Sequence, residues 1–243
     1  RSFALGDDGT PAGYAYREFP QHFPAPGLVE HDPDDIWEAT TATLADLLER
    51  LDGEAVAAVG ITNQRETTVV WDRRSGRPLH RALVWQDRRT AGRCEALAEA
   101  GHLAAVRRAT GLVLDPYFSA TKLEWLLTEG GVDAGPDLAF GTVDSWILWN
   151  LTAGAVHATE ASNASRTLLF DIEALAWAPE LLDLFGVPTG CLPEVHPSGG
   201  RFGRTAAGTP LPAGIPVSGI LGDQQAALFG QACLEPGLTK NTY

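Results

Sequence analysis

The sequence contains no methionine in its 243 residues, and it begins with Arg1. Since a complete reading frame starts with methionine, we expect this chain to be part of a longer protein. The sequence also has no run of about eighteen apolar residues, the length that a membrane-spanning helix needs. Its amino end lacks the charged segment and apolar run of a secretion signal. Neither a membrane span nor a signal peptide is therefore expected in these residues.

Cysteines and basic residues are scarce. The three cysteines, Cys94, Cys191 and Cys233, are odd in number and form no CxxC pattern. This argues against a secreted disulfide framework and favours a reducing cytoplasm. The 18 Lys and Arg residues face 31 Asp and Glu residues, which gives a formal net charge of −13. Such an acidic chain is not expected to bind nucleic acid or an anionic membrane through its charge.

Several common active-site motifs are also missing. The sequence has no GxxxxGK[ST] phosphate loop, no GxGxxG opening a helix, no HExxH and no GxSxG, so the commonest patterns of nucleotide binding and hydrolysis are absent. No pair among the six histidines has metal-ligand spacing, and no protein metal site is expected. These histidines are His22, His31, His80, His102, His157 and His196.

Apolar runs of strand length alternate with segments of helical periodicity. The clearest helix follows Asp32, which is placed to cap it, with Pro33 in its first turn and apolar residues at three- and four-residue spacing. The expected strands are residues 2–6 and 13–19, which form a hairpin, and 56–62, 67–72, 82–85, 138–142 and 215–219. The other expected helices are residues 88–100, 103–109, 120–127, 145–151 and 224–229. This alternation predicts one layered α/β domain, with the Gly- and Pro-rich residues 193–216 as its loosest region.

Four polar residues, Asn63 to Glu66, follow the apolar run 56–62, and the carboxyl ends of strands are where open α/β sheets bind ligands. An arginine only donates hydrogen bonds and an ionised glutamate only accepts them. Arg65 and Glu66 together therefore suit a hydroxyl group, which does both, and they indicate a small polyol. The alternative is a hairpin turn with a local ion pair, and this stretch alone does not choose between them.

Two further positions have alternative interpretations. Tyr117 lies in a loop before a helix and either presents its hydroxyl or packs, as Phe118 is expected to do. Asp223 follows a strand at the start of a helix, where it is either an N-cap or a general base that accepts a hydroxyl proton. Phosphoryl transfer needs little more than such a base, because positioning and electrostatics, with Mg²⁺ on the phosphate oxygens, supply most of the catalysis.

Three separated motifs resemble the glycerol kinases within the FGGY family of carbohydrate kinases. They are NQRETTVVW at 63–71, VWQDRRTA with DPYFSATKLEW at 84–91 and 115–125, and SGILGDQQAALFGQ at 218–231. Three other segments, PGLVEHDPDDIW, FGTVDSWILW and SNASRTLLFD, extend the resemblance collinearly over nearly the whole chain.

The resemblance implies a ribonuclease-H-like domain of the actin and hexokinase type, with a mixed sheet and flanking helices. It also implies phosphorylation of glycerol to sn-glycerol 3-phosphate, with ATP as co-substrate and Mg²⁺ as its metal. In the family, the residues that contact glycerol match Arg65, Glu66, Tyr117, Asp223 and Gln224, and the residue matching Asp223 is the general base. Arg1 falls where the family has an arginine near the nucleotide phosphates.

The resemblance further implies that about half of a family chain is present. Residues 1–234 would form the glycerol-binding domain without its first strand and phosphate loop, and 235–243 would begin the connection to the nucleotide-binding domain. On this interpretation the chain alone is inactive. Two alternatives stay open, namely a non-catalytic polyol- or partner-binding module of this fold and a kinase of this family for another small polyol. Whether the protein forms a homo-oligomer also stays open.

Overall fold

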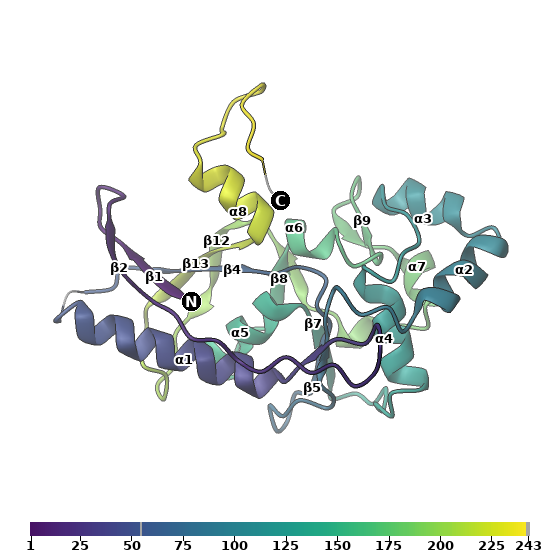
Figure 1. Cartoon of the computed structure of the whole chain (residues 1–243), viewed down its shortest axis with the longest axis horizontal. Coiled ribbons are helices and arrows are strands. Elements are labelled where there is room, and N and C mark those ends of the chain that lie inside the picture. The colour runs from purple at the N-terminus through teal and green to yellow at the C-terminus, as the bar shows by residue number, and fades with distance from the viewer. Residues whose placement is uncertain (54, 242–243) are drawn as a thin grey trace.

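The computed structural model describes residues 1–53 and 55–241. At its centre β4 (Val59–Asn63) and β13 (Pro216–Gly222) pair in parallel, and β12 (Gly199–Arg204) pairs with β13 antiparallel. Helices lie on both sides of these strands (Figure 1). The observed architecture is the mixed α/β arrangement expected from the sequence.

Helix α1 (Pro33–Arg50) packs against the hairpin of β1 (Ser2–Leu5) and β2 (Pro11–Ala15), as Figure 1 shows. The Asp32 side chain accepts a hydrogen bond of 3.0 Å from the backbone N–H of Asp34, which confirms the predicted cap. The second strand of the hairpin ends at Ala15 rather than at residue 19.

The remaining elements are short. The strands are β3 (Glu30–His31), β5 (Val69–Asp72), β6 (Ala82–Leu83), β7 (Leu138–Gly141), β8 (Ala158–Glu160), β9 (Phe170–Asp171), β10 (Ala176–Trp177) and β11 (Glu194–His196). The helices are α2 (Ala91–Glu99), α3 (Leu103–Thr110), α4 (Ser119–Thr128), α5 (Val143–Leu151), α6 (Ala161–Ala164), α7 (Pro179–Leu184) and α8 (Asp223–Gly230), with a 3-10 turn at Thr189–Cys191. None of the described helices is long and apolar enough to cross a bilayer.

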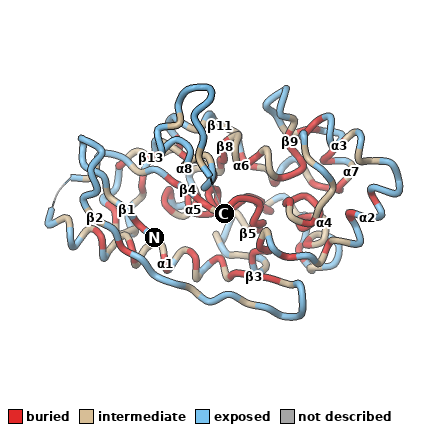
Figure 2. Tube along the Cα trace, turned by 45° about the horizontal axis from the view of Figure 1, so that its top comes forward, coloured by how far each residue is buried: buried red, intermediate tan, exposed pale blue. Residues whose placement is uncertain are grey.

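Two hydrophobic clusters form the interior, and the paired strands β5 and β7 contribute to both. Val70 and Phe140 belong to the cluster built with α2, α3, α4 and α7, whereas Trp71 and Ala139 belong to the cluster built with α1, α5, β4 and β13. Successive side chains of a strand point to opposite faces of the sheet, so this two-stranded ladder divides the interior. In Figure 2, buried segments occur around α5 and β4 on one side and around α4 and α7 on the other.

Residues 193–216, predicted to be the loosest region, contain the strands β11 and β12. One glycine of this segment is closely packed. Gly203 has φ +131°, and a Cβ atom there would lie 2.8 Å from Cγ2 of Val156. Glycine in a strand often marks the close approach of another part of the chain, here the Val156 side chain, and a sequence pattern does not separate this use from flexibility.

His157 lies against the rings of Trp71 and Trp149 and is held at both ring nitrogens. Its Nε2 lies 2.8 Å from the carbonyl oxygen of Phe140, so Nε2 carries the proton and Nδ1 accepts from Nη2 of Arg73 at 2.9 Å. Burial lowers the pKa of His157 to about 4, from an ordinary value of 6.5.

This lowered pKa makes stability depend on pH. Between pH 4 and 6.5 the unfolded chain binds more protons at His157 than the folded chain does, so the stability that neutral His157 contributes is lost as pH falls through this window. Asp144, whose pKa is raised to about 6 by burial, acts in the opposite sense. We therefore compare wild type with His157→Gln by urea denaturation. Their difference in unfolding free energy should shrink by about 3 kcal/mol from pH 7 to pH 4. A difference that does not change with pH would contradict the lowered pKa of His157.

Candidate active site

Arg65 and Asp223 meet at one edge of the central sheet. β4 and β13 run parallel, with Asn63 opposite Gly222 in their register, so the residues that follow each strand lie at the same edge. Nε of Arg65 lies 3.7 Å from Oδ1 of Asp223. The Arg65 side chain is only 6% exposed, whereas the Asp223 side chain is 55% exposed. The carboxylate is therefore accessible to a solute beside a buried guanidinium.

Gly222 makes room for this arginine. A Cβ atom at Gly222 would lie 2.3 Å from Cδ of Arg65, so any side chain there would displace the arginine. The backbone N–H of Gly222 donates to Oγ of Ser162 at 2.9 Å, and that hydroxyl donates to Oε1 of the fully buried Glu160 at 2.5 Å. These contacts fix the turn between β13 and α8.

The interpretation of Asp223 as an N-cap is wrong. Helix α8 starts at Asp223 itself, and Gly222 occupies the cap position. The Asp223 carboxylate accepts a 2.8 Å hydrogen bond from the backbone N–H of Gln224. An acidic group in a first helical turn is favoured by the helix dipole, and here it also faces solvent.

Glu66 pairs with a distant arginine, so the alternative of a local ion pair with Arg65 is wrong. Its Oε1 accepts a hydrogen bond of 2.6 Å from Nε of Arg166. The backbone of Glu66 is left-handed, with φ +62°, and its carbonyl accepts from Oγ of Ser119 at 3.0 Å. Burial raises the pKa of Glu66 despite the neighbouring arginines. Strained backbone of this kind is enriched at functional sites.

Tyr117 joins the same group of side chains through its ring. Cζ of Arg166 lies 5.5 Å from the centre of the Tyr117 ring, and the Trp85 ring lies 5.2 Å away. Nζ of the buried Lys122 donates to the carbonyls of Pro116, Tyr117 and Phe118 and holds this loop. Phe118 is 6% exposed, so its predicted packing is confirmed. Tyr117 both packs and borders the site.

Arg166 is the main site residue that the sequence did not single out. It bridges Glu66 and Tyr117, and its side chain is 26% exposed. It lies within the segment SNASRTLLFD at 162–171, which carries part of the family resemblance, but no local pattern distinguishes it from other arginines. We call the group Arg65, Glu66, Tyr117, Arg166 and Asp223 the acceptor cluster.

Two predicted residues are not brought into the acceptor cluster by a direct contact. The Gln224 side chain is exposed and makes no hydrogen bond within residues 1–53 and 55–241, although its position beside Asp223 places it nearby. Arg1 is exposed and lies with its Cζ 5.3 Å from the centre of the Tyr16 ring. Their expected contacts with glycerol and with nucleotide phosphates remain predictions.

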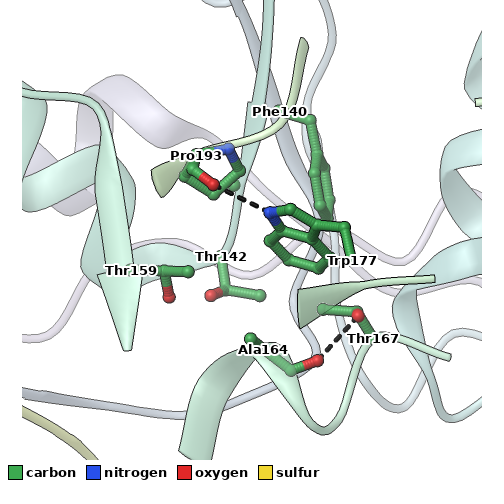
Figure 3. Close-up of a pocket in the computed structure, with 8 residues that line it drawn as sticks. Phe140, Thr142, Thr159, Ala164, Thr167, Trp177 and Pro193 are labelled. Atoms are coloured by element: carbon green, nitrogen blue, oxygen red, sulfur yellow. Dashed lines mark hydrogen bonds between the residues drawn. The ribbon is translucent and has the colours of Figure 1, made fainter. Parts of the chain in front are cut away.

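The pocket between β7, β8 and Trp177 is filled by side chains and leaves no room for a ligand. Figure 3 shows Trp177, whose Nε1 donates to the Pro193 carbonyl at 2.9 Å, lying beside Phe140 and facing Thr142 and Thr159. The space left there admits no water-sized sphere. In the described part of the chain, no group of three or more His, Cys, Asp or Glu side chains is arranged to hold a metal ion.

The acceptor cluster offers donors and acceptors to one small polar ligand. Nε of Arg65 is buried and has no hydrogen-bond partner among the described residues, and leaving such a donor unpaired costs free energy. The terminal nitrogens of Arg65 also make no hydrogen bond with the described residues, and a ligand hydroxyl beside Asp223 would accept from them. The same hydroxyl could pass its proton to the Asp223 carboxylate, which is the arrangement that general-base catalysis requires.

Comparison with known proteins shows which family of proteins this chain resembles. The N-terminal domain of the FGGY family of carbohydrate kinases matches residues 1–230. The chain is 55% identical over its whole length to a glycerol kinase of Trichlorobacter lovleyi and 56% identical over 97% of its length to one of Thermus brockianus, covering 50% and 49% of those proteins. The chain thus spans about half the length of the curated relatives it matches.

Solved structures agree with this fold. A crystal structure of Plasmodium falciparum glycerol kinase with ADP matches 96% of the chain and 48% of its own, with a TM-score of 0.91 and 31% identity. A xylulose kinase of Rhodospirillum rubrum matches with a TM-score of 0.88 at 22% identity, a likeness of fold alone. The expected actin- and hexokinase-type domain is confirmed by these neighbours.

Proposed function

The chain belongs to the FGGY family of carbohydrate kinases, and from that premise we propose that it is the substrate-binding half of an ATP-dependent glycerol kinase. We call the full-length protein the parent kinase. Its proposed reaction transfers a phosphoryl group to glycerol and yields sn-glycerol 3-phosphate. Support comes from the glycerol kinases at 55% and 56% identity and from the acceptor cluster, which suits a small polyol.

The observation that carries the proposal is the exposed Asp223 carboxylate 3.7 Å from the buried Arg65 guanidinium. We assign Asp223 as the general base that takes the proton of the attacking hydroxyl. Arg65 then orients that hydroxyl and Glu66, held by Arg166, accepts from a second one. Tyr117 and Gln224 border the ligand on either side in this assignment. These are positioning duties, which supply much of the catalysis in phosphoryl transfer.

The nucleotide and its metal are assigned outside the acceptor cluster. ATP would be the phosphoryl donor, with Arg1 near its phosphates. Mg²⁺ would neutralise phosphate oxygens in such a reaction, and within the described residues no group of three or more His, Cys, Asp or Glu side chains is arranged to hold it. Residues 1–234 would form the substrate domain and 235–243 the start of a connection, of which residues 242–243 lie outside the described residues. We assign the enzyme to the cytoplasm, consistent with three free cysteines.

A substrate panel tests the proposal. The parent kinase is assayed for ATP-dependent phosphorylation of glycerol, erythritol, dihydroxyacetone and xylulose. We expect kcat/KM for glycerol to exceed the others by at least about tenfold, because a site built to pair specific hydroxyls rejects ligands that leave its buried groups unpaired. A preference for another polyol would overturn the substrate, and absence of any phosphorylation with intact folding would favour a non-catalytic binding module.

Gly222→Ala tests the space that glycine gives to Arg65. The new methyl group would displace the guanidinium, so we expect KM for glycerol in the parent kinase to rise about tenfold or more, the worth of a charge-assisted hydrogen bond. The matched control is Gly219→Ala in the same strand, where the nearest neighbour of a Cβ lies at an ordinary 3.5 Å. Equal effects of the two substitutions would show that Arg65 is not the group displaced.

A further inference from the structure

A second polar cavity lies away from the acceptor cluster, between the turn before β8 and the strands β11 and β12. It has a volume of about 490 Å³, within the range of small-molecule sites. Arg73, His157, Glu194, His196 and Arg201 give it a polar lining, and it shares no lining residue with the acceptor cluster. Figure 2 shows β11 beside β8 near the surface of the molecule. We call this cavity the Arg73 groove.

Arg73 is held rigidly in the groove. Its Nη2 donates to Nδ1 of His157 and to the carbonyl oxygen of Gly190, both at 2.9 Å. Because Nε2 of His157 donates to Phe140, the imidazole keeps Nδ1 free to accept. A guanidinium fixed in this way loses little side-chain entropy when it binds a ligand, which favours preorganised recognition.

One nitrogen of the Arg73 guanidinium is free to bind a ligand. Both hydrogens of Nη2 are used on His157 and Gly190, and Nε is enclosed without a hydrogen-bond partner, whereas Nη1 makes no hydrogen bond to the described residues. No carboxylate in the described part of the chain lies within the 4.0 Å ion-pair distance of Arg73, in a protein whose formal net charge is −13. A partly buried cation that lacks a counter-charge is costly unless an anion completes it.

Two other charged residues contribute to the net charge of the groove. Arg201 is an exposed second cation on β12 and forms no ion pair with the described residues. Glu194 opposes both arginines, but its side chain is 83% exposed, and its Oε2 lies 3.3 Å from Nε2 of His196. The groove thus carries two cations and one solvated anion at neutral pH. Val156 and Leu192 add apolar wall beside the polar groups.

We propose that the Arg73 groove binds a small phosphate-bearing anion, with Arg73 as the main contact and Arg201 as a second cation. The two N–H groups of Nη1 would donate to phosphate oxygens, and such charge-assisted hydrogen bonds are about twice as strong as neutral ones. This inference rests on the groove alone and does not depend on the proposed kinase activity.

The test is a calorimetric titration of the parent kinase with inorganic phosphate. Acetate is the second probe. Arg73→Lys keeps the charge but loses the Nη1 donor and the contacts with His157 and Gly190 that fix it in place, so we expect phosphate binding to weaken about tenfold or more. Arg201→Gln should weaken it about threefold, the effect of an exposed charge, and Glu194→Gln should strengthen it by a similar factor because it removes an opposing charge. Arg74→Gln is the matched control, since Arg74 is exposed beside Arg73 but does not line the groove.

Thermal midpoints of each variant report on folding. If Arg73→Lys does not fold, the phosphate affinities of Arg201→Gln and Glu194→Gln still test the proposal, because both positions are exposed. The proposal is overturned by the absence of saturable phosphate binding, by equal losses in Arg74→Gln and Arg201→Gln, or by a Glu194→Gln variant that binds no more tightly than wild type. Acetate binding as tight as phosphate binding would overturn the assigned ligand class.

Discussion

Asp223→Asn in the parent kinase should lower kcat for glycerol by about two to four decades, the usual contribution of a general base. The amide has nearly the same shape as the carboxylate and can still accept the hydrogen bond from the backbone N–H of Gln224. It cannot accept the proton of an attacking hydroxyl. Because binding contacts are kept, the dissociation constant for glycerol should change by less than about threefold. Steady-state kinetics together with a glycerol titration separate the two effects.

A matched control exists in the same fold. Asp32 also stands at the start of a helix, where it caps α1, and Asn is as good a cap as Asp. Asp32→Asn should therefore leave both kcat and KM unchanged. If Asp223→Asn keeps near wild-type kcat, Asp223 is not the base.

Arg65→Gln is expected to have the second largest effect, a loss of about one to two decades in glycerol affinity. Charge-assisted hydrogen bonds of a guanidinium are worth about 1.5 to 3 kcal/mol. The Arg65 side chain also packs inside the protein, because it is only 6% exposed and its Cδ lies against Gly222. Gln keeps part of the aliphatic stem, which makes it a better test than Ala.

The control for Arg65→Gln is Arg93→Gln. Arg93 is 43% exposed and pairs with Glu124 on the surface, so its loss should change stability by less than about 1 kcal/mol and leave affinity alone. Unfolding midpoints and glycerol titrations are measured for both variants. A folded Arg65→Gln protein with unchanged affinity would remove Arg65 from the substrate site.

The long helices and the central strands were predictable, because their patterns are local. The spacing of apolar residues and the cap at Asp32 predicted α1, and the apolar runs predicted β4 and β13 within about three residues. Several of the elements of two to four residues, among them β3, β8 and α6, were not predicted. Such elements are defined by tertiary hydrogen bonds, which local propensity does not report.

The site was predictable in part for the same reason. Polar residues after a strand indicated Arg65 and Glu66, the local sequence offered Tyr117 and Asp223 with alternative interpretations, and the family resemblance added Gln224. The partner of Glu66 lies 100 residues away at Arg166, and nothing local marks that contact. The space that Gly222 leaves for Arg65 likewise depends on a parallel strand pair that only the folded chain brings together.

A crystal structure of the parent kinase with bound glycerol tests the central claim most directly. We predict one glycerol hydroxyl within about 3 Å of the Asp223 carboxylate, the reach of a general base, and within hydrogen-bond distance of Arg65. A second hydroxyl should contact Glu66 in the orientation that Arg166 now gives it. Glycerol bound elsewhere, or bound with no hydroxyl facing Asp223, would contradict the account.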